Sequence, residues 1–231
     1  MSDTILITGA NRGIGLELVK IFSDHNWQVL ACCRHPEQAE ELKKLEGSNR
    51  AISTFALDVT DNEAINRLAK GLHKQPIDIL LNNAGIYGPE NQAFGNIGVD
   101  VWLEVMRTNV TAPLKMAEAF VDSVAASRLK IIGMMGSMMG SLEDNTSGDH
   151  YIYRTSKAAV HMVTKSISID LRDRGIISVV VHPGWVQTEM GGPQAPTSAA
   201  ESAAGLYHVL TGLTAENNGQ FLTFEGKELP W

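Results

Sequence analysis

Residues 4–15 read TILITGANRGIG, and this stretch decides the fold. The apolar residues Ile5–Ile7 have strand character and run into three closely spaced glycines, after which a helical pattern begins at Ile14. A strand, a glycine-rich turn and a helix in this order aim several backbone N–H groups at one point, which suits a phosphate. Glycine is required there because a Cβ would hold a pyrophosphate away from the backbone. The Gly-x-x-x-Gly-x-Gly spacing predicts a nucleotide-binding turn, with an ordinary strand–helix connection as the alternative.

The rest of the chain alternates apolar segments of strand length with amphipathic helical segments. Such alternation is typical of a parallel sheet covered by helices on both faces. We predict one domain over residues 1–231, a doubly wound α/β Rossmann fold with a parallel seven-stranded sheet. Further strands are expected at 27–33, 51–57, 77–81, 129–135, 176–181 and 220–223, and the two longest helices at 99–127 and 153–174.

The composition excludes several classes of protein. With 44% apolar residues the chain is not disordered, and its net charge of −7 argues against nucleic acid as the main partner. No apolar run reaches the roughly 18 residues that cross a bilayer, and the glycine turn interrupts the first one too early for a signal peptide. Adjacent Cys32 and Cys33 make a poor disulfide and a poor zinc site, so they are expected to be buried. We expect a cytoplasmic protein with no metal ion and no membrane partner.

Tyr153 and Lys157 lie four residues apart on one predicted helix, so their side chains face the same way. A tyrosine ordinarily has a pKa of about 10, too high for proton transfer at neutral pH. A cationic neighbour favours the phenolate and is expected to lower that pKa. Taken alone, this spacing is common on solvated helices. Its position after the fifth predicted strand favours a catalytic pair.

Pro113 lies inside the predicted helix 99–127. Proline has no N–H, so it cannot donate to the carbonyl oxygen four residues earlier, which belongs to Asn109. The sequence therefore predicts a bend and a free backbone acceptor at Asn109.

Taken together, these motifs resemble the short-chain dehydrogenase/reductase family over essentially the whole chain. TGANRGIG at 8–15 is similar to the family's cofactor turn, and NNAG at 82–85 to its motif after the fourth strand. DV at 58–59 resembles the pair on the adenine side, and PG at 183–184 the turn on the nicotinamide side. The phrases HPGWVQTEMGGP and GKELPW further resemble the C-factor/sniffer-like subgroup. The residues that match the family's catalytic tetrad are Asn109, Ser137, Tyr153 and Lys157.

The resemblance implies an oxidoreductase that reduces a small-molecule aldehyde, ketone or quinone to an alcohol, or catalyses the reverse. Tyr153 would exchange the proton with the carbonyl oxygen, and Ser137 would hydrogen-bond the same oxygen. Lys157 would hold the nicotinamide ribose, and Asn109 would anchor a water through its carbonyl. The implied cofactor-binding residues are Gly9, Asn11, Arg12, Gly13, Ile14, Gly15, Arg34, Asp58, Val59, Asn83, Ala84, Gly85, Tyr153, Lys157, Pro183, Gly184, Val186 and Thr188.

The sequence departs from the family pattern near Ser137. The family often has two serines after the fifth strand, and Gly136 replaces the first of them here. The segment 141–151 is also longer than usual, which leaves the geometry between Ser137 and Tyr153 open.

The predicted cofactor is NADP(H). A member that prefers NAD places Asp or Glu at the end of the second strand, where it accepts from the ribose 2′-hydroxyl. Arg34 occupies that position, and Arg12 in the glycine turn approaches from the other side. Two guanidinium groups offer paired donors to a 2′-phosphate, while an unrelated surface arginine is the alternative.

Two questions stay open. The second functional hypothesis is a cofactor-binding signalling or regulatory protein of the C-factor type on the same fold. For assembly, the resemblance implies a homodimer through the two long helices, with a homotetramer as the alternative. The apolar residues available for that interface include Val105, Leu114, Ala117, Phe120, Val121, Val160, Val163 and Ile167.

Overall fold

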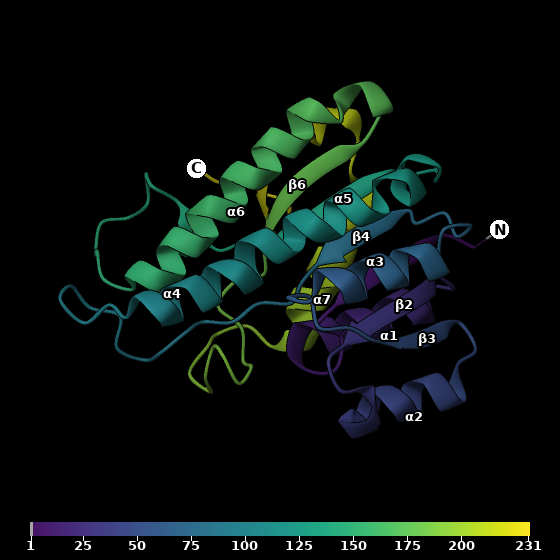
Figure 1. Ribbon diagram of the computed structural model, residues 1–231, viewed down its shortest axis with the longest axis horizontal. Helices are drawn as coiled ribbons and strands as arrows, with labels where there is room; N and C mark the ends of the chain where they lie inside the picture. Colours follow the sequence, from purple (N-terminus) through teal and green to yellow (C-terminus); the bar gives the residue numbers. More distant parts are fainter. Residues whose placement is uncertain (1) are drawn as a thin grey trace.

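The computed structural model describes residues 2–231 and contains the predicted parallel sheet (Figure 1). Its seven strands follow the order β3-β2-β1-β4-β5-β6-β7, and every neighbouring pair is parallel. The strands are β1 (Thr4–Thr8), β2 (Gln28–Cys33), β3 (Ile52–Ala56), β4 (Ile79–Asn82), β5 (Ile131–Met135), β6 (Ile177–His182) and β7 (Phe221–Thr223). The helices are α1 (Gly13–Asp24), α2 (Glu40–Ser48), α3 (Asn62–Gly71), α4 (Val99–Met106), α5 (Ala112–Ala125), α6 (Tyr151–Asp170) and α7 (Ala199–Gly212).

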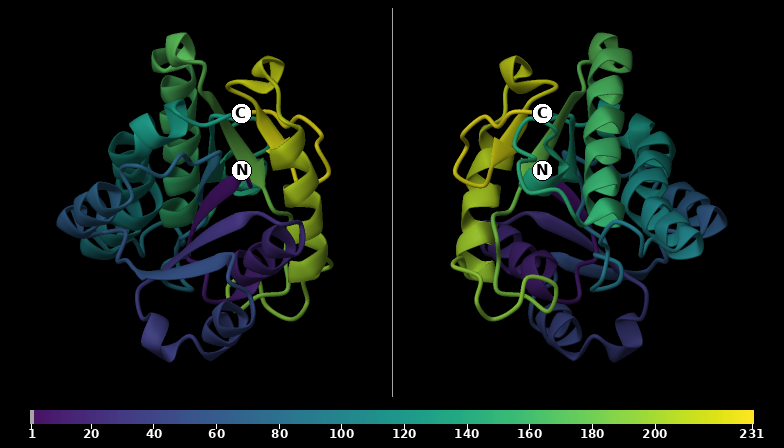
Figure 2. Two further views of the ribbon diagram at one scale, coloured as in Figure 1. Left: turned by 90° about the vertical axis from the view of Figure 1, so that its right-hand side faces the viewer. Right: turned by 90° about the vertical axis from the view of Figure 1, so that its left-hand side faces the viewer.

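Helices cover both faces of the sheet, as predicted (Figure 2). Successive strand residues point to opposite faces, so each strand contributes to two cores. Ile5 and Ile7 of β1 pack with α1, α2 and α7, whereas Leu6 packs with α3, α5 and α6. The near-continuous apolar strands are explained by this burial on two sides.

The predicted helix 99–127 is divided into three parts. Between α4 and α5, residues Arg107–Thr111 form a π-helical turn, in which the Ala112 N–H bonds back to the Arg107 carbonyl oxygen. A π-turn inserts one extra residue into a helix and often marks a functional site. Pro113 is the second residue of α5, directly after the π-turn, so the N–H that it lacks falls where the helical hydrogen-bond pattern changes. The predicted irregularity at Asn109 is therefore present, as a π-turn.

Most of the apolar residues suggested for a dimer interface are used inside the chain. Val105 and Phe120 are fully buried, and Ala117, Val160 and Ile167 are almost so. These five residues are buried within the chain, which leaves only the partly buried Leu114, Val121 and Val163 of that set to face a partner. Other side chains on α4 and α6 are exposed instead, namely Val99, Leu103, Met162 and Ile169.

Cys32 and Cys33 are both free and buried in β2, as expected. Burial, followed by the neighbouring Cys33, raises the pKa of the Cys32 thiol far above its usual range. Within residues 2–231, no helix has the length and apolar character needed to cross a membrane. Over the same residues, no three His, Cys, Asp or Glu side chains are grouped so as to hold a metal ion.

Two glycines within helices, one in a crowded place and one in an open place, test how closely the helices are packed. An ideal Cβ on Gly205 in α7 would lie 2.4 Å from the Phe224 carbonyl oxygen, whereas one on Gly47 in α2 meets nothing within 4 Å. We expect Gly205→Ala to lower the free energy of unfolding in urea by about 1–3 kcal/mol through overpacking. The matched Gly47→Ala should raise it by up to about 1 kcal/mol, because alanine is the better helix former. Equal effects of the two substitutions would contradict this packing.

Candidate active site

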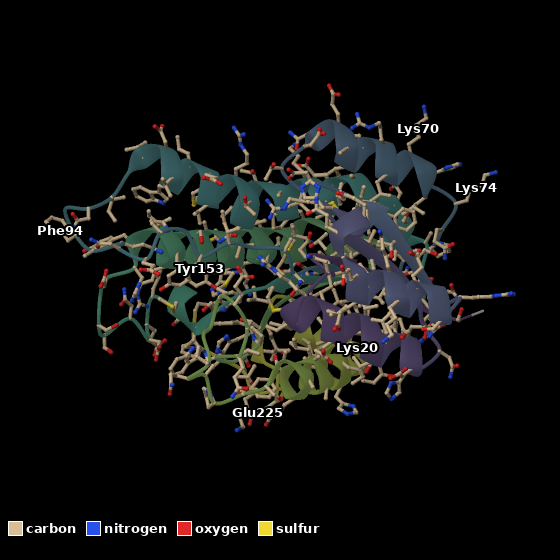
Figure 3. All side chains as sticks on the ribbon, turned by 90° about the horizontal axis from the view of Figure 1, so that it is seen from below. Lys20, Lys70, Lys74, Phe94, Tyr153 and Glu225 are labelled. Carbon is tan, nitrogen blue, oxygen red and sulfur yellow. The ribbon has the colours of Figure 1, made fainter. Side chains whose placement is uncertain are left out.

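The candidate residues meet at the carboxyl edge of the sheet, near the point where the strand order reverses. From β1 the chain builds outward to β2 and β3 on one side and to β4–β7 on the other. In open α/β sheets, ligands bind in the crevice at this switch point. Figure 3 shows Tyr153 well inside the outline of the molecule, whereas Phe94, Lys70 and Lys74 project from its edge.

The glycine turn after β1 has the backbone that a phosphate cradle requires. Gly9 and Gly13 adopt left-handed φ angles of +66° and +53°. An ideal Cβ on Gly15 would lie 2.2 Å from the Gly9 carbonyl oxygen, so only glycine fits there. The N-cap residue of α1 is Arg12, and its side chain makes no capping hydrogen bond within residues 2–231. The first turn of α1 also carries no acidic residue. Its N–H groups are thus directed at the crevice and suit an anion.

The motif after β4 is bonded to this turn. The Thr8 hydroxyl accepts the N–H groups of Asn83 and Ala84, both at 3.0 Å. The Asn83 carboxamide donates to the carbonyl oxygens of Thr8 at 2.8 Å and Gly9 at 3.2 Å. Asn83 therefore has a structural contact that fixes the turn. Ala84 and Gly85 follow it into the crevice, where the ideal Cβ of Gly85 would lie 3.2 Å from Asn109 Oδ1.

The structure brings the four tetrad residues together. Lys157 Nζ lies 5.5 Å from the centroid of the Tyr153 ring and donates to the Met135 carbonyl oxygen at 2.7 Å. Ser137 follows β5, and its hydroxyl accepts the Met139 N–H at 3.2 Å. All four side chains are at least nine-tenths buried. The arrangement gathers a phenol, an ammonium group and a hydroxyl in a space largely closed to water.

The Asn109 side chain has a role that the proline argument did not reveal. Its Oδ1 accepts the Ile86 N–H at 2.9 Å, and its Nδ2 donates to the Ile86 carbonyl oxygen at 2.8 Å and to Ser156 Oγ at 3.0 Å. It thus ties the segment after β4 to α6. The backbone carbonyl group of Asn109 lies in the π-turn, four residues before Pro113, which has no N–H to donate to it.

Burial determines the protonation states of Tyr153 and Lys157. It raises the pKa of Tyr153 to about 12, and a hydrogen bond with the Ser137 side chain acts in the opposite direction. It lowers the pKa of Lys157 to about 8. The expectation that Lys157 brings the Tyr153 pKa down is wrong, because desolvation of the phenolate is the largest effect and raises the pKa. Tyr153 is held as the neutral phenol.

The residues proposed for the adenine end lie at the ends of β2 and β3. Arg34 directly follows β2 and is exposed, and its charge acts on Asp58. Burial raises the pKa of Asp58, but hydrogen bonds from Thr60 and the charge of Arg34 outweigh it, so the pKa is lowered. Val59 is half-buried beside it. Arg12 forms an ion pair with Glu189, whereas the charge of Arg34 acts on Asp58.

The segment after β6 reaches back to the glycine turn. An ideal Cβ on Gly13 would lie 3.2 Å from Thr188 Cγ2. Gly184 has a φ of +87°, which turns the chain after Pro183. Val186 is buried and bridges to Thr197. The exposed Asn11 and the half-buried Ile14 complete the turn on the opposite side.

Gln92 joins the crevice to α6 and was missed in the sequence. It is 1% exposed, and its Oε1 accepts the Tyr153 N–H at 2.8 Å. Its Nε2 donates to the carbonyl oxygens of Tyr87 and Pro89. Gln92 therefore caps α6 from a distant loop, and nothing in its sequence neighbourhood indicates this.

Tyr87 is a second tyrosine in the site. Its ring centroid lies 4.6 Å from that of Tyr153, and its hydroxyl is 2.9 Å from His150 Nδ1. Gly148, Asp149 and His150 all adopt left-handed φ angles, which for the last two stores backbone strain. The long segment 141–151 thereby brings His150 into contact with Tyr87, which itself packs on Tyr153.

The chain is similar to known proteins over most of its length. The sequence model of the short chain dehydrogenases matches residues 3–199. The C-signal of Myxococcus xanthus is 40% identical over 156 residues, which cover 68% of this chain and 93% of that protein. An uncharacterised oxidoreductase of Schizosaccharomyces pombe is 34% identical, with 97% of this chain and 96% of that protein covered.

Solved structures share the whole fold. The carbonyl reductase Sniffer of D. melanogaster superimposes with a TM-score of 0.94 at 33% identity, over 100% of both chains. The NADPH-bound carbonyl reductase from chicken fatty liver gives a TM-score of 0.93 at 34% identity, over 100% of this chain and 99% of that chain.

Proposed function

The chain belongs to the short-chain dehydrogenase/reductase family, and on this premise we propose that it is an NADP(H)-dependent carbonyl reductase. It reduces an aldehyde, ketone or quinone to the alcohol. The observation that carries the proposal is the buried Tyr153 side chain, which lies beside Ser137 and Lys157. The two solved structures named above are carbonyl reductases, one with NADPH bound, and they support the same substrate and cofactor class.

The crevice fits the proposed cofactor. The left-handed Gly9 and Gly13 leave a cradle that a Cβ would narrow, and the N-terminus of α1 adds its partial positive charge for the pyrophosphate. Arg34 would supply the cation for a 2′-phosphate, and Arg12 in the turn would add a second one if it left its ion pair with Glu189. Asp58 and Val59 would hold the adenine. When bound, NADPH supplies the hydride for the carbonyl carbon.

The chain's own residues handle the proton. The neutral Tyr153 hydroxyl donates it to the carbonyl oxygen, on which negative charge develops. Ser137 hydrogen-bonds the same oxygen and stabilises that charge. Lys157, beneath the Tyr153 ring, would hold the nicotinamide ribose hydroxyls. Asn109 would anchor the water that returns a proton to Tyr153 through Lys157.

The protonation state of Tyr153 bears on the pH dependence of the two directions. With its pKa raised to about 12, Tyr153 is protonated at neutral pH and can donate its proton to a carbonyl oxygen. Oxidation of an alcohol needs the phenolate, so its rate should increase as the pH rises.

The similarity to the C-signal of Myxococcus xanthus supports the second candidate, a cofactor-binding regulatory protein. The two candidates differ in turnover. A regulatory protein would bind NADPH and leave every carbonyl unreduced, whereas the proposed enzyme oxidises NADPH when a suitable aldehyde, ketone or quinone is added.

We expect Tyr153→Phe to lower kcat for NADPH-dependent carbonyl reduction at least about 100-fold, because it deletes the proton donor and keeps the ring. The dissociation constant for NADPH, followed by its fluorescence, should change less than about threefold. Tyr151→Phe is the matched control, since Tyr151 is 39% exposed on the same helix, and it should retain kcat. Near-normal turnover by Tyr153→Phe would remove Tyr153 from the mechanism.

Arg34→Asp should reverse the cofactor preference. It removes a donor to the 2′-phosphate and adds an acceptor for a bare 2′-hydroxyl. A charge-assisted hydrogen bond contributes about 1.5–3 kcal/mol, so KM for NADPH should rise about tenfold or more while KM for NADH falls. Arg50→Asp makes the same charge change before β3, at the opposite end of the sheet, and should leave both constants unaltered. Equal KM values for both cofactors in the unmodified protein would defeat the NADP(H) assignment.

The proposed assembly is a homodimer. Helices α4 and α6 carry three exposed apolar side chains, Leu103, Met162 and Ile169, which are 61%, 67% and 56% accessible. A partner subunit would bury them. Light scattering should give about twice the 25.1 kDa of one chain, with a tetramer as the larger alternative. Met162→Glu should shift the mass towards one chain. A mass near 25.1 kDa for the unmodified protein would contradict the proposal.

A further inference from the structure

The N–H group of Ser137 lies just beyond the last hydrogen bond of the sheet. The ladder between β5 and β6 is extended by the Gly136 N–H, which donates to the Val181 carbonyl oxygen at 2.9 Å. The next buried N–H belongs to Ser137, and it donates to Nε2 of His161 at 3.4 Å. A buried N–H without an acceptor costs about 1–3 kcal/mol. His161 therefore provides the hydrogen-bond acceptor for the first buried N–H group beyond the β5–β6 ladder.

Two glycines make room for the His161 ring on either side of Ser137. An ideal Cβ on Gly136 would lie 2.6 Å from His161 Nε2 and 2.2 Å from Val180 Cγ1. One on Gly140 would lie 2.7 Å from His161 Cε1. The glycine at 136, where the family often has serine, is thus explained by Val180 and the imidazole together.

The surroundings keep His161 neutral. The side chain is 3% exposed and packs on Phe221 and Trp231, with ring centroids 4.5 Å and 5.8 Å away. The charged or titratable groups that act on it are Lys157 on its own helix and His182 on β6, and burial together with these two lowers the pKa of His161 to about 3. A neutral ring whose Nε2 accepts a hydrogen bond carries its proton on Nδ1.

Burial of the His161 Nδ1 atom lowers the stability of the folded chain. The atom is buried and has no hydrogen-bond partner among residues 2–231. An apolar ring would fill the same space without burying that donor. The one contact that distinguishes histidine from an apolar side chain here is the bond to Ser137.

We propose that His161 is a positioning residue of the active site, whose Nε2 anchors the Ser137 main chain so that the serine hydroxyl faces Tyr153 and the substrate carbonyl. This inference rests on the proposed function for its kinetic consequence. Met139 supplies a second restraint, because its N–H occupies one acceptor site of Ser137 Oγ. The hydroxyl hydrogen is then directed to the Tyr153 oxygen and, with substrate bound, to the reacting oxygen. The anchor thus acts from behind the serine, at the end of β5.

Loss of the anchor has two kinetic consequences. Ser137 turns away from the reacting oxygen, which lowers kcat and leaves NADPH binding intact. Tyr153 also loses the serine hydrogen bond that partly offsets its raised pKa. Its pKa then rises further, so the pH profile for alcohol oxidation, which needs the phenolate, moves to higher pH.

The test compares His161→Phe with His161→Gln. Phenylalanine keeps an aromatic ring against Phe221 and Trp231 but has no acceptor, whereas glutamine keeps an acceptor oxygen. His161→Phe should lose about 10- to 100-fold in kcat, hold the NADPH dissociation constant within about threefold and shift the oxidation profile upward. His161→Gln should recover most of kcat and the pH profile. Retention of both by His161→Phe would overturn the proposal.

A measurement on the unmodified protein needs no turnover. With ¹⁵N-labelled histidine, His161 should show a protonated Nδ1 and an unprotonated Nε2 from roughly pH 5 to pH 9. The Ser137 amide should exchange with deuterium as slowly as the ladder amides of β5. A protonated Nε2, or an amide that exchanges as fast as those of an open loop, overturns the anchor. If these results hold and no carbonyl is reduced with NADPH, the proposed function fails while the anchor stands.

Discussion

The active-site edge of the sheet depends on one hydroxyl group, that of Thr8. It is buried at the end of β1 and accepts two N–H groups from the segment that follows β4. Without it, the Ala84 N–H would lose its acceptor, at about 1–3 kcal/mol. The Asn83 N–H would keep only the Leu81 carbonyl oxygen, at 3.1 Å. Because Asn83 returns two hydrogen bonds to the glycine turn, the cradle and the crevice floor form one rigid unit across the point where the strand order reverses. The remaining groups of the site are positioned relative to these hydrogen bonds between Thr8 and Asn83.

Exclusion of water determines the protonation states of the titratable side chains in the candidate site. Tyr153, Lys157 and His161 are all buried, and in each of them burial moves the pKa towards the neutral form. The phenol therefore keeps its proton, and the imidazole keeps its lone pair as an acceptor. In such a low-dielectric region, a hydrogen bond or charge acts more strongly than in water, so a few contacts suffice to orient the reacting groups.

The sheet could be predicted because its signals are local and repeated. Apolar strands that end in glycine or polar residues recur along the chain, and parallel strands bring those ends to one edge, where the tetrad lies. The contacts of Gln92 could not be predicted, since they depend on the path of an irregular loop. His161 had a signal that was overlooked, because it follows Lys157 by four residues and so faces the same way. The pKa of Tyr153 was misjudged because a sequence shows the neighbouring charge but not the depth of burial.

The crowding around His161 links positions that are distant in the sequence. A serine at 136 would need space that His161 and Val180 now fill, and any side chain at 140 would meet the same ring. A side chain at 140 would also meet the Lys157 backbone, so a change at 161 alone does not make room there. Divergence of this chain towards the two-serine pattern is therefore epistatic: a serine at 136 is accommodated only together with changes at both 161 and 180.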